Sequence, residues 1–142
     1  MDEVMPRSNP PPITITEPDF KTLESLLSSE AFRNLPGSEM LQAELDRAAV
    51  VSSEEIDTDV VTMNSVVRFV EEGAYKAYQL RLVYPEQAGE PGTVSILAPV
   101  GSALLGLTVG QFIRWPASGG RQLRLRVVSV VHQPESDGTL TS

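Results

Sequence analysis

Two carboxylates, Asp57 and Asp59, form the nearest approach to a metal-binding motif in this sequence. Alternating acids can chelate a divalent cation, but Ca²⁺ takes about six or more oxygen ligands, and two carboxylates in a polar linker supply too few. The chain has no cysteine and one histidine, His132, which excludes thiolate sites and histidine clusters. These residues predict neither a metal site nor a cofactor site.

Gly101 and Gly106 have the spacing of the glycines in a phosphate-binding loop. Leu107 and Thr108 follow where such a loop needs a lysine and a hydroxyl residue, so the positive charge that holds the phosphates is missing. The glycines are better explained by a chain that turns into and out of a short helix. We therefore expect no nucleotide site here.

The negative charge of the chain is concentrated in its first part. The whole chain has 11 basic and 19 acidic residues and a net charge of −8. Residues 1–59 carry 13 acids and 4 bases, net −9, whereas residues 60–142 carry 6 acids and 7 bases, net +1. This pattern predicts an acidic element displayed from a nearly neutral body. A basic partner surface or a metal ion would complement its charge; alternatively, the element is a solvated face that keeps the protein soluble. The acidic balance argues against direct nucleic-acid binding.

The elements that position these residues begin after an N-terminal arm, residues 1–12. Its prolines predict a disordered segment, and its acids, in place of the bases of a signal peptide, predict that it is not one. Thr16 is a predicted cap for a helix from residue 17 to about 30, and Ser38 is a predicted cap for a second helix. Both helices have an apolar stripe, so residues 13–52 predict an acidic, antiparallel helical hairpin. The stripes consist of Phe20, Leu23, Leu26 and Leu27 in the first helix, and Leu41, Leu45 and Ala48 in the second.

A polar linker, residues 53–59, precedes a region of alternating hydrophobicity, residues 60–142. Alternation predicts strands at residues 61–69, 74–84, 94–98 and 123–131, with a short helix near residues 101–106. The uncharged stretch from Pro91 to Ile113 is interrupted by prolines and glycines, so we interpret it as core and not as a membrane span. The predicted fold class is α+β, a helical hairpin followed by an antiparallel sheet domain, in a cytoplasmic protein.

Three separated blocks resemble a known family. Residues 94–110 follow the pattern A-P-x-x-x-A-L-x-G-x-x-x-G and resemble the C-terminal domain of the GreA/GreB transcript-cleavage factors. Residues 59–65 and 41–48 extend the resemblance over Ile13 to Glu135, and they are most similar to the branch named for regulation of nucleoside diphosphate kinase. The resemblance implies an FKBP-like C-terminal domain, a short coiled-coil hairpin, and binding to RNA polymerase near its secondary channel.

The resemblance also implies which residues make the contact. In Gre factors a longer hairpin enters the channel, and acidic residues at its tip help to hold a catalytic metal. Here a basic residue and a proline turn separate the two acids of the turn, so we expect binding without stimulated RNA cleavage. The expected contact residues are Glu30, Arg33, Asn34 and Glu39 at the tip, with Leu97, Ala98, Pro99 and Val100 in the body. Leu97 stands where Gre proteins can have an acid.

The function predicted from these patterns is that of a non-enzymatic regulator that binds RNA polymerase and competes with Gre-type factors. One alternative is regulation of nucleoside diphosphate kinase by direct binding. A second alternative, raised by the implied FKBP-like fold, is a small prolyl isomerase with a pocket drawn from Phe69, Tyr78, Tyr84, Phe112 and Trp115. Arg114, Arg121, Arg124 and Arg126 predict a mildly basic patch, either protein-binding or solvated. A monomer is the expected state.

Overall fold

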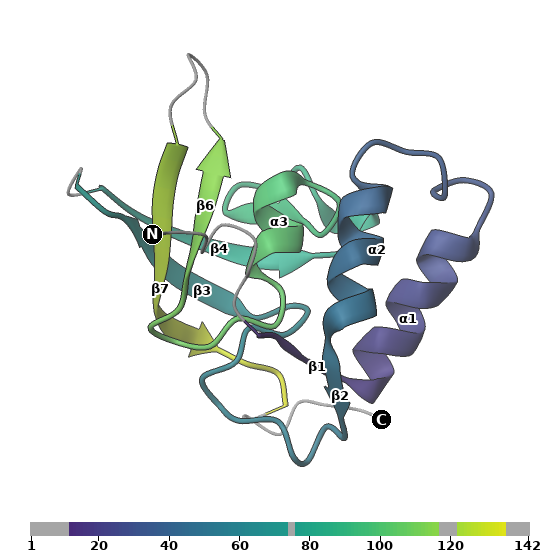
Figure 1. Ribbon diagram of the computed structural model, residues 1–142, viewed down its shortest axis with the longest axis horizontal. Helices are drawn as coiled ribbons and strands as arrows, with labels where there is room; N and C mark the ends of the chain where they lie inside the picture. Colours follow the sequence, from purple (N-terminus) through teal and green to yellow (C-terminus); the bar gives the residue numbers. More distant parts are fainter. Residues whose placement is uncertain (1–11, 74–75, 117–121, 136–142) are drawn as a thin grey trace, which may run out of the picture.

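The computed structural model describes residues 12–73, 76–116 and 122–135, and within them the chain folds as the predicted α+β class (Figure 1). The helices are α1 (Glu17–Ser28), α2 (Ser38–Arg47) and α3 (Pro99–Leu104), with a 3₁₀ turn, η2 (Pro85–Gln87). The strands are β1 (Thr14–Thr16), β2 (Ala49–Val51), β3 (Val66–Glu71), β4 (Lys76–Val83), β5 (Thr93–Ser95), β6 (Phe112–Pro116) and β7 (Gln122–His132). The predicted arm lies outside the described residues except for Pro12, which is exposed.

Helix α1 begins where the capping pattern predicts. The Thr16 hydroxyl accepts a hydrogen bond from the Asp19 backbone N–H at 3.3 Å, and Pro18 lies in the first turn, where its missing N–H costs nothing. Helix α2 begins differently, so the predicted Ser38 cap is wrong. Gly37 takes the capping position with a left-handed φ of 93°, which favours glycine, and Ser38 is the first residue of the helix.

The two helices lie side by side (Figure 1), and the predicted leucine stripes face inward, with Leu23, Leu27, Leu41 and Leu45 all buried. At the base of the pair, β1 and β2 form a short parallel ladder in which Ile15 pairs with Val50. Strand β2 was not predicted, because Ala49, Val50 and Val51 were assigned to the end of the hairpin. Its partner lies at the start of the chain, which no local pattern reveals.

The other strands form one sheet in the order β5-β4-β3-β7-β6. All neighbours are antiparallel except β5, which runs parallel to β4, so the prediction of a wholly antiparallel sheet is wrong at this edge. Strand β3 begins at Val66 and not at residue 61, because Asn64 has a φ of 68° and Ser65 N–H closes a turn onto the Thr62 carbonyl at 3.0 Å. Strand β6 was not predicted.

One buried cluster joins the helix pair to the sheet. It contains Ile15 and Leu41 from the first part of the chain together with Val67, Phe69 and Leu104 from the second part. Helix α3 contacts α2, β5 and β6, and so lies between the helix pair and the sheet (Figure 1). Burial of each large apolar side chain contributes about 1.5–3 kcal/mol, so this shared core fixes the helix pair on the body. No helix in the described ranges is long and apolar enough to cross a membrane.

Candidate protein-binding site

The predicted tip residues lie at the end of the helix pair where α1 turns into α2. Glu30, Arg33 and Asn34 belong to the turn between α1 and α2, Glu39 lies in the first turn of α2, and all four are exposed. The turn is held by its own backbone, since Arg33 N–H donates to the Ser29 carbonyl at 3.0 Å. The tip therefore presents its charged side chains from a hydrogen-bonded turn.

The predicted body residues lie where β5 passes into α3. Leu97 N–H donates to the Ser95 hydroxyl at 3.0 Å, and Ser102 N–H donates to the Ala98 carbonyl at 2.9 Å. Pro99 is exposed at the start of α3, while Leu97, Ala98 and Val100 are half-buried. The helix was expected at residues 101–106 but begins at Pro99, because proline suits the first turn of a helix.

Gly37 brings the tip and the body segment together. It lies against the Leu97 backbone so closely that a Cβ atom at this position would overlap the Leu97 carbonyl oxygen. Helices α2 and α3 also contact one another beside this point. The tip residues and residues 97–100, which the sequence placed in two separate regions, therefore adjoin. We call them together the composite surface.

Two apolar residues beside the composite surface were not predicted. Leu35 in the turn is 41% exposed, and Met40 in the first turn of α2 is also exposed. Exposed apolar side chains within a polar rim are typical of protein contacts. A signal existed for both residues: Leu35 lies between Asn34 and Pro36 in a turn, and Met40 falls outside the stripe of Leu41 and Leu45.

A carboxyl cluster at the opposite end of α1 was also missed. The Asp19 carboxylate accepts a hydrogen bond from Met63 N–H at 3.1 Å, and the Glu135 carboxylate accepts one from the Thr62 hydroxyl at 2.8 Å. The pKa of Asp19 is raised to about 6. Burial is the main cause and the charge of Glu135 adds to it, whereas the hydrogen bond from Met63 N–H lowers the pKa. Burial, together with Asp19, also raises the pKa of the Tyr84 phenol. The cluster links α1, the turn before β3 and the chain after β7.

The other sequence candidates have structural roles. Asp57 and Asp59 are exposed, and the Asp57 carbonyl accepts a hydrogen bond from Gln133 Nε2 at 2.7 Å. Gly106 has a φ of 81° and leaves no room for a Cβ beside Ile13, so it serves packing. Among the described residues, no group of three or more His, Cys, Asp or Glu side chains is arranged to hold a metal ion.

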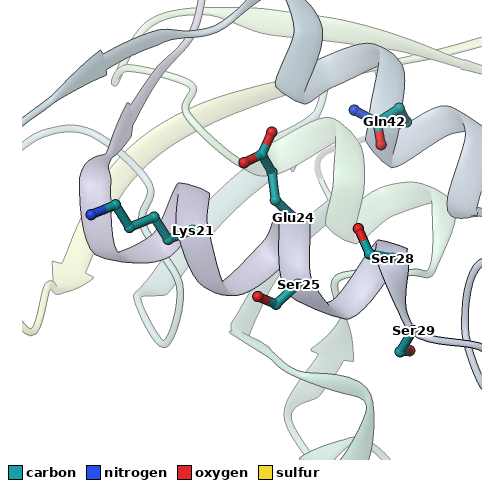
Figure 2. Close-up of a pocket in the computed structure, with 6 residues that line it drawn as sticks. All are labelled: Lys21, Glu24, Ser25, Ser28, Ser29 and Gln42. Atoms are coloured by element: carbon teal, nitrogen blue, oxygen red, sulfur yellow. The ribbon is translucent and has the colours of Figure 1, made fainter.

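An open hollow of about 690 Å³ lies beside α1 and α2 (Figure 2). Its lining is polar and consists of Lys21, Glu24, Ser25, Ser28, Ser29 and Gln42. Figure 2 shows that Glu24 points toward α2 whereas Ser25 and Ser29 point away from it, so these groups do not converge on one ligand. The Ser29 hydroxyl is already used, donating to the Leu26 carbonyl at 2.8 Å.

The aromatic residues considered for an isomerase pocket are dispersed. Phe69 is buried and stacks on Tyr78 with ring centroids 5.2 Å apart, so this pair belongs to the core. Tyr84 belongs to the carboxyl cluster, and Phe112 is exposed on the sheet. The side chain of Trp115 lies outside the described part of the structure.

Comparisons with known proteins agree with this architecture. Residues 56–132 match the family model for the C-terminal domain of the transcription elongation factors GreA and GreB, and residues 11–51 match the model for the Rnk N-terminus. The chain therefore belongs to the Rnk group of the GreA/GreB family.

Individual relatives match over different lengths. The "Regulator of nucleoside diphosphate kinase" of Escherichia coli (strain K12) is 43% identical over 129 residues, which cover 90% of this chain and 95% of that protein. GreA of Thermodesulfovibrio yellowstonii is 36% identical over 72 residues, covering 50% of this chain and 46% of that protein. A solved structure of an elongation factor GreA/GreB from Nitrosomonas europaea has a TM-score of 0.72 and 49% identity, and the match covers 86% of this chain and 99% of that one.

Proposed function

We propose that this protein binds RNA polymerase near its secondary channel through the composite surface and competes there with Gre-type factors. In this proposal, residues 60–142 form an FKBP-like anchor and the helix pair is a short coiled-coil hairpin. The observation that carries the proposal is the contact of Gly37 with the Leu97 backbone. This contact holds the tip beside the body segment, so a partner can touch both at once. Binding then does not have to supply the free energy for ordering the tip relative to the body segment.

The same proposal includes no stimulation of transcript cleavage. Helix α1 has 12 residues and α2 has 10, so at about 1.5 Å per residue neither exceeds about 18 Å. The tip carries Glu30 and Glu39 at the two ends of its turn, with Arg33 between them. A helix pair of this length suits occlusion of a channel mouth better than delivery of carboxylates to a distant catalytic centre.

The test uses purified RNA polymerase core, with GreA as competitor and transcript cleavage measured in the same reaction. We expect binding, displacement of GreA and no added cleavage. Leu35→Glu should weaken binding about tenfold or more, because it places a charge in the apolar part of the contact. Val50→Glu is the matched control, since Val50 is equally exposed at 41% but lies at the base of the helix pair. Equal loss in both variants, or added cleavage, would contradict the proposal.

A second candidate is direct regulation of nucleoside diphosphate kinase, favoured by the name of the E. coli relative. If this protein binds the kinase, the purified kinase should change its phosphoryl-transfer rate when the protein is added without polymerase. An unchanged rate, combined with polymerase binding, would leave only the first candidate.

A further inference from the structure

The sheet has a second face that the proposed function does not use. Along β3 and β7 the side chains alternate, so Val67, Phe69, Leu125 and Val127 are buried beneath the helices, whereas Arg68, Arg124 and Arg126 lie on the opposite side. Phe112 of β6 pairs in register with Arg126. We call the three arginines and Phe112 the arginine face.

The guanidinium groups of the arginine face are already arranged around a carboxylate. The Glu72 carboxylate accepts a hydrogen bond from Arg126 Nε at 3.2 Å and lies 3.6 Å from Arg124 Nε. The Arg124 and Arg126 side chains nevertheless remain 46% and 43% exposed. One carboxylate is thus shared by two guanidinium groups that still face solvent, and each group retains donors for a further anion.

The arginine face also has an apolar contact point. The Arg124 guanidinium lies 4.1 Å from the centre of the Phe112 ring, and Phe112 is 38% exposed. Stacking on an aromatic ring fixes the plane of a guanidinium and leaves its N–H edge free to bind. An exposed aromatic ring beside an ordered arginine is the combination that protein interfaces favour at their centre.

The arginine face contains three guanidinium groups. Glu72 is the one carboxylate found in ion pairs with Arg124 and Arg126 among the described residues. Positive charge therefore exceeds negative charge here, in a chain whose net charge is −8. An external anion would complement this excess of positive charge.

We propose that the arginine face binds an acidic segment of a partner protein, with Glu or Asp carboxylates seated beside Arg124 and Arg126 as Glu72 is, and with Phe112 packed against the same segment. Carboxylates are favoured because the structure already shows one in this place, bonded to Arg126 Nε and paired with Arg124 Nε. A nucleic-acid backbone is disfavoured because the net charge of the chain repels an extended polyanion at long range. A short acidic segment meets mainly the local positive field.

The test is a titration of a fluorescein-labelled peptide containing six glutamates by fluorescence anisotropy, in 50 mM and 300 mM NaCl. We expect saturable binding that weakens at the higher salt concentration. Arg124→Gln should lower the affinity about fivefold or more, while leaving Glu72 paired with Arg126. Lys21→Gln is the matched control, an exposed base on α1 whose loss should change the affinity less than twofold.

Three outcomes would overturn the inference: no peptide binding at 50 mM NaCl, equal loss in the two variants, or tighter binding of a labelled ten-nucleotide uridine RNA through Arg124. Circular dichroism and the midpoint of thermal unfolding show whether each variant is folded. Phe112→Ala supplies an independent check, because it should weaken peptide binding without changing the number of charges.

Discussion

Gly37 is the residue on which the geometry of the composite surface depends. Its φ of 93° is strained for any side chain, and a Cβ atom would overlap the Leu97 carbonyl oxygen. Gly37→Ala should therefore lower the free energy of unfolding by about 2–4 kcal/mol, about 1–2 from the left-handed backbone and the rest from the overlap. Urea denaturation measures this loss.

Gly89→Ala separates the two causes. Gly89 has a similar φ of 104°, but no atom lies within 4 Å of the Cβ position, so this variant has backbone strain alone. At equal fractions folded, Gly37→Ala should also weaken polymerase binding, whereas Gly89→Ala should not. A Gly37→Ala protein as stable as Gly89→Ala would show that the approach to Leu97 is not tight.

Asp19 should make stability depend on pH in the direction opposite to that of a paired carboxylate. Its pKa is raised from 3.8 to about 6, so the folded protein binds the proton more tightly than the unfolded chain does. The contribution of Asp19 to the free energy of unfolding is therefore present below pH 4 and is lost as the pH rises through about 6. Its full size is at most about 3 kcal/mol.

Asp19→Asn tests this dependence, because asparagine is neutral at every pH and its oxygen can still accept the Met63 hydrogen bond. We expect a higher melting temperature than wild type at pH 7.5 and a smaller difference at pH 4.5. Glu24→Gln, an exposed change on the same helix, is the control. The other carboxyl groups are shared by wild type and Asp19→Asn, so their effects cancel when the two proteins are compared at the same pH. A melting-temperature difference between the two proteins that is equal at pH 7.5 and pH 4.5 would contradict a raised pKa of Asp19.

At the scale of elements, the sequence predicted what depends on neighbouring residues. The Thr16 cap and the inward stripes of Leu23, Leu27, Leu41 and Leu45 are confirmed because capping and helical periodicity are local. Strand β2 was missed because it exists only by pairing with β1, which precedes the two helices in the sequence. Strand β6 is short, and its partner β7 supplies its register.

The sequence also did not predict that the two parts of the composite surface lie next to each other. Residues 97–100 and the turn were both proposed as contacts, but nothing local indicates that Gly37 touches Leu97. Tertiary contacts between distant segments also bury Asp19 and bring it close to Glu135. The family resemblance therefore suggested the candidate contact residues, whereas the core shared by the helices and the sheet determines which of them adjoin.

The helix pair as an element should contribute to binding through its charged tip. Glu30→Lys with Glu39→Lys should weaken competition with GreA about threefold to tenfold and leave the melting temperature nearly unchanged, because both side chains are exposed. Glu54→Lys with Asp59→Lys makes the same change of net charge in the exposed segment after β2. Competition equal to wild type in the tip variant would restrict the contact to residues 97–100.

At the scale of the whole molecule, charge is distributed unevenly. The first 59 residues have net charge −9 and the rest +1. The acidic helix pair and the arginine face thus lie on parts of one molecule with opposite electrostatic character. Such a distribution orients a protein during encounter, so that a basic surface of a partner meets the helix pair first. Net charge alone would not select one end of the molecule.

The association rate with RNA polymerase should therefore depend on where the acids lie and not only on how many there are. For wild type, we expect the rate constant to fall about tenfold or more between 50 mM and 300 mM salt, as steering by charge is screened. Glu24→Gln, Glu30→Gln and Glu39→Gln combined should reduce this salt dependence. Glu71→Gln, Glu86→Gln and Glu90→Gln combined remove as many charges from the body and should leave it nearly intact. Stopped-flow fluorescence measures both, and identical salt dependence in the two triple variants would show that only net charge acts.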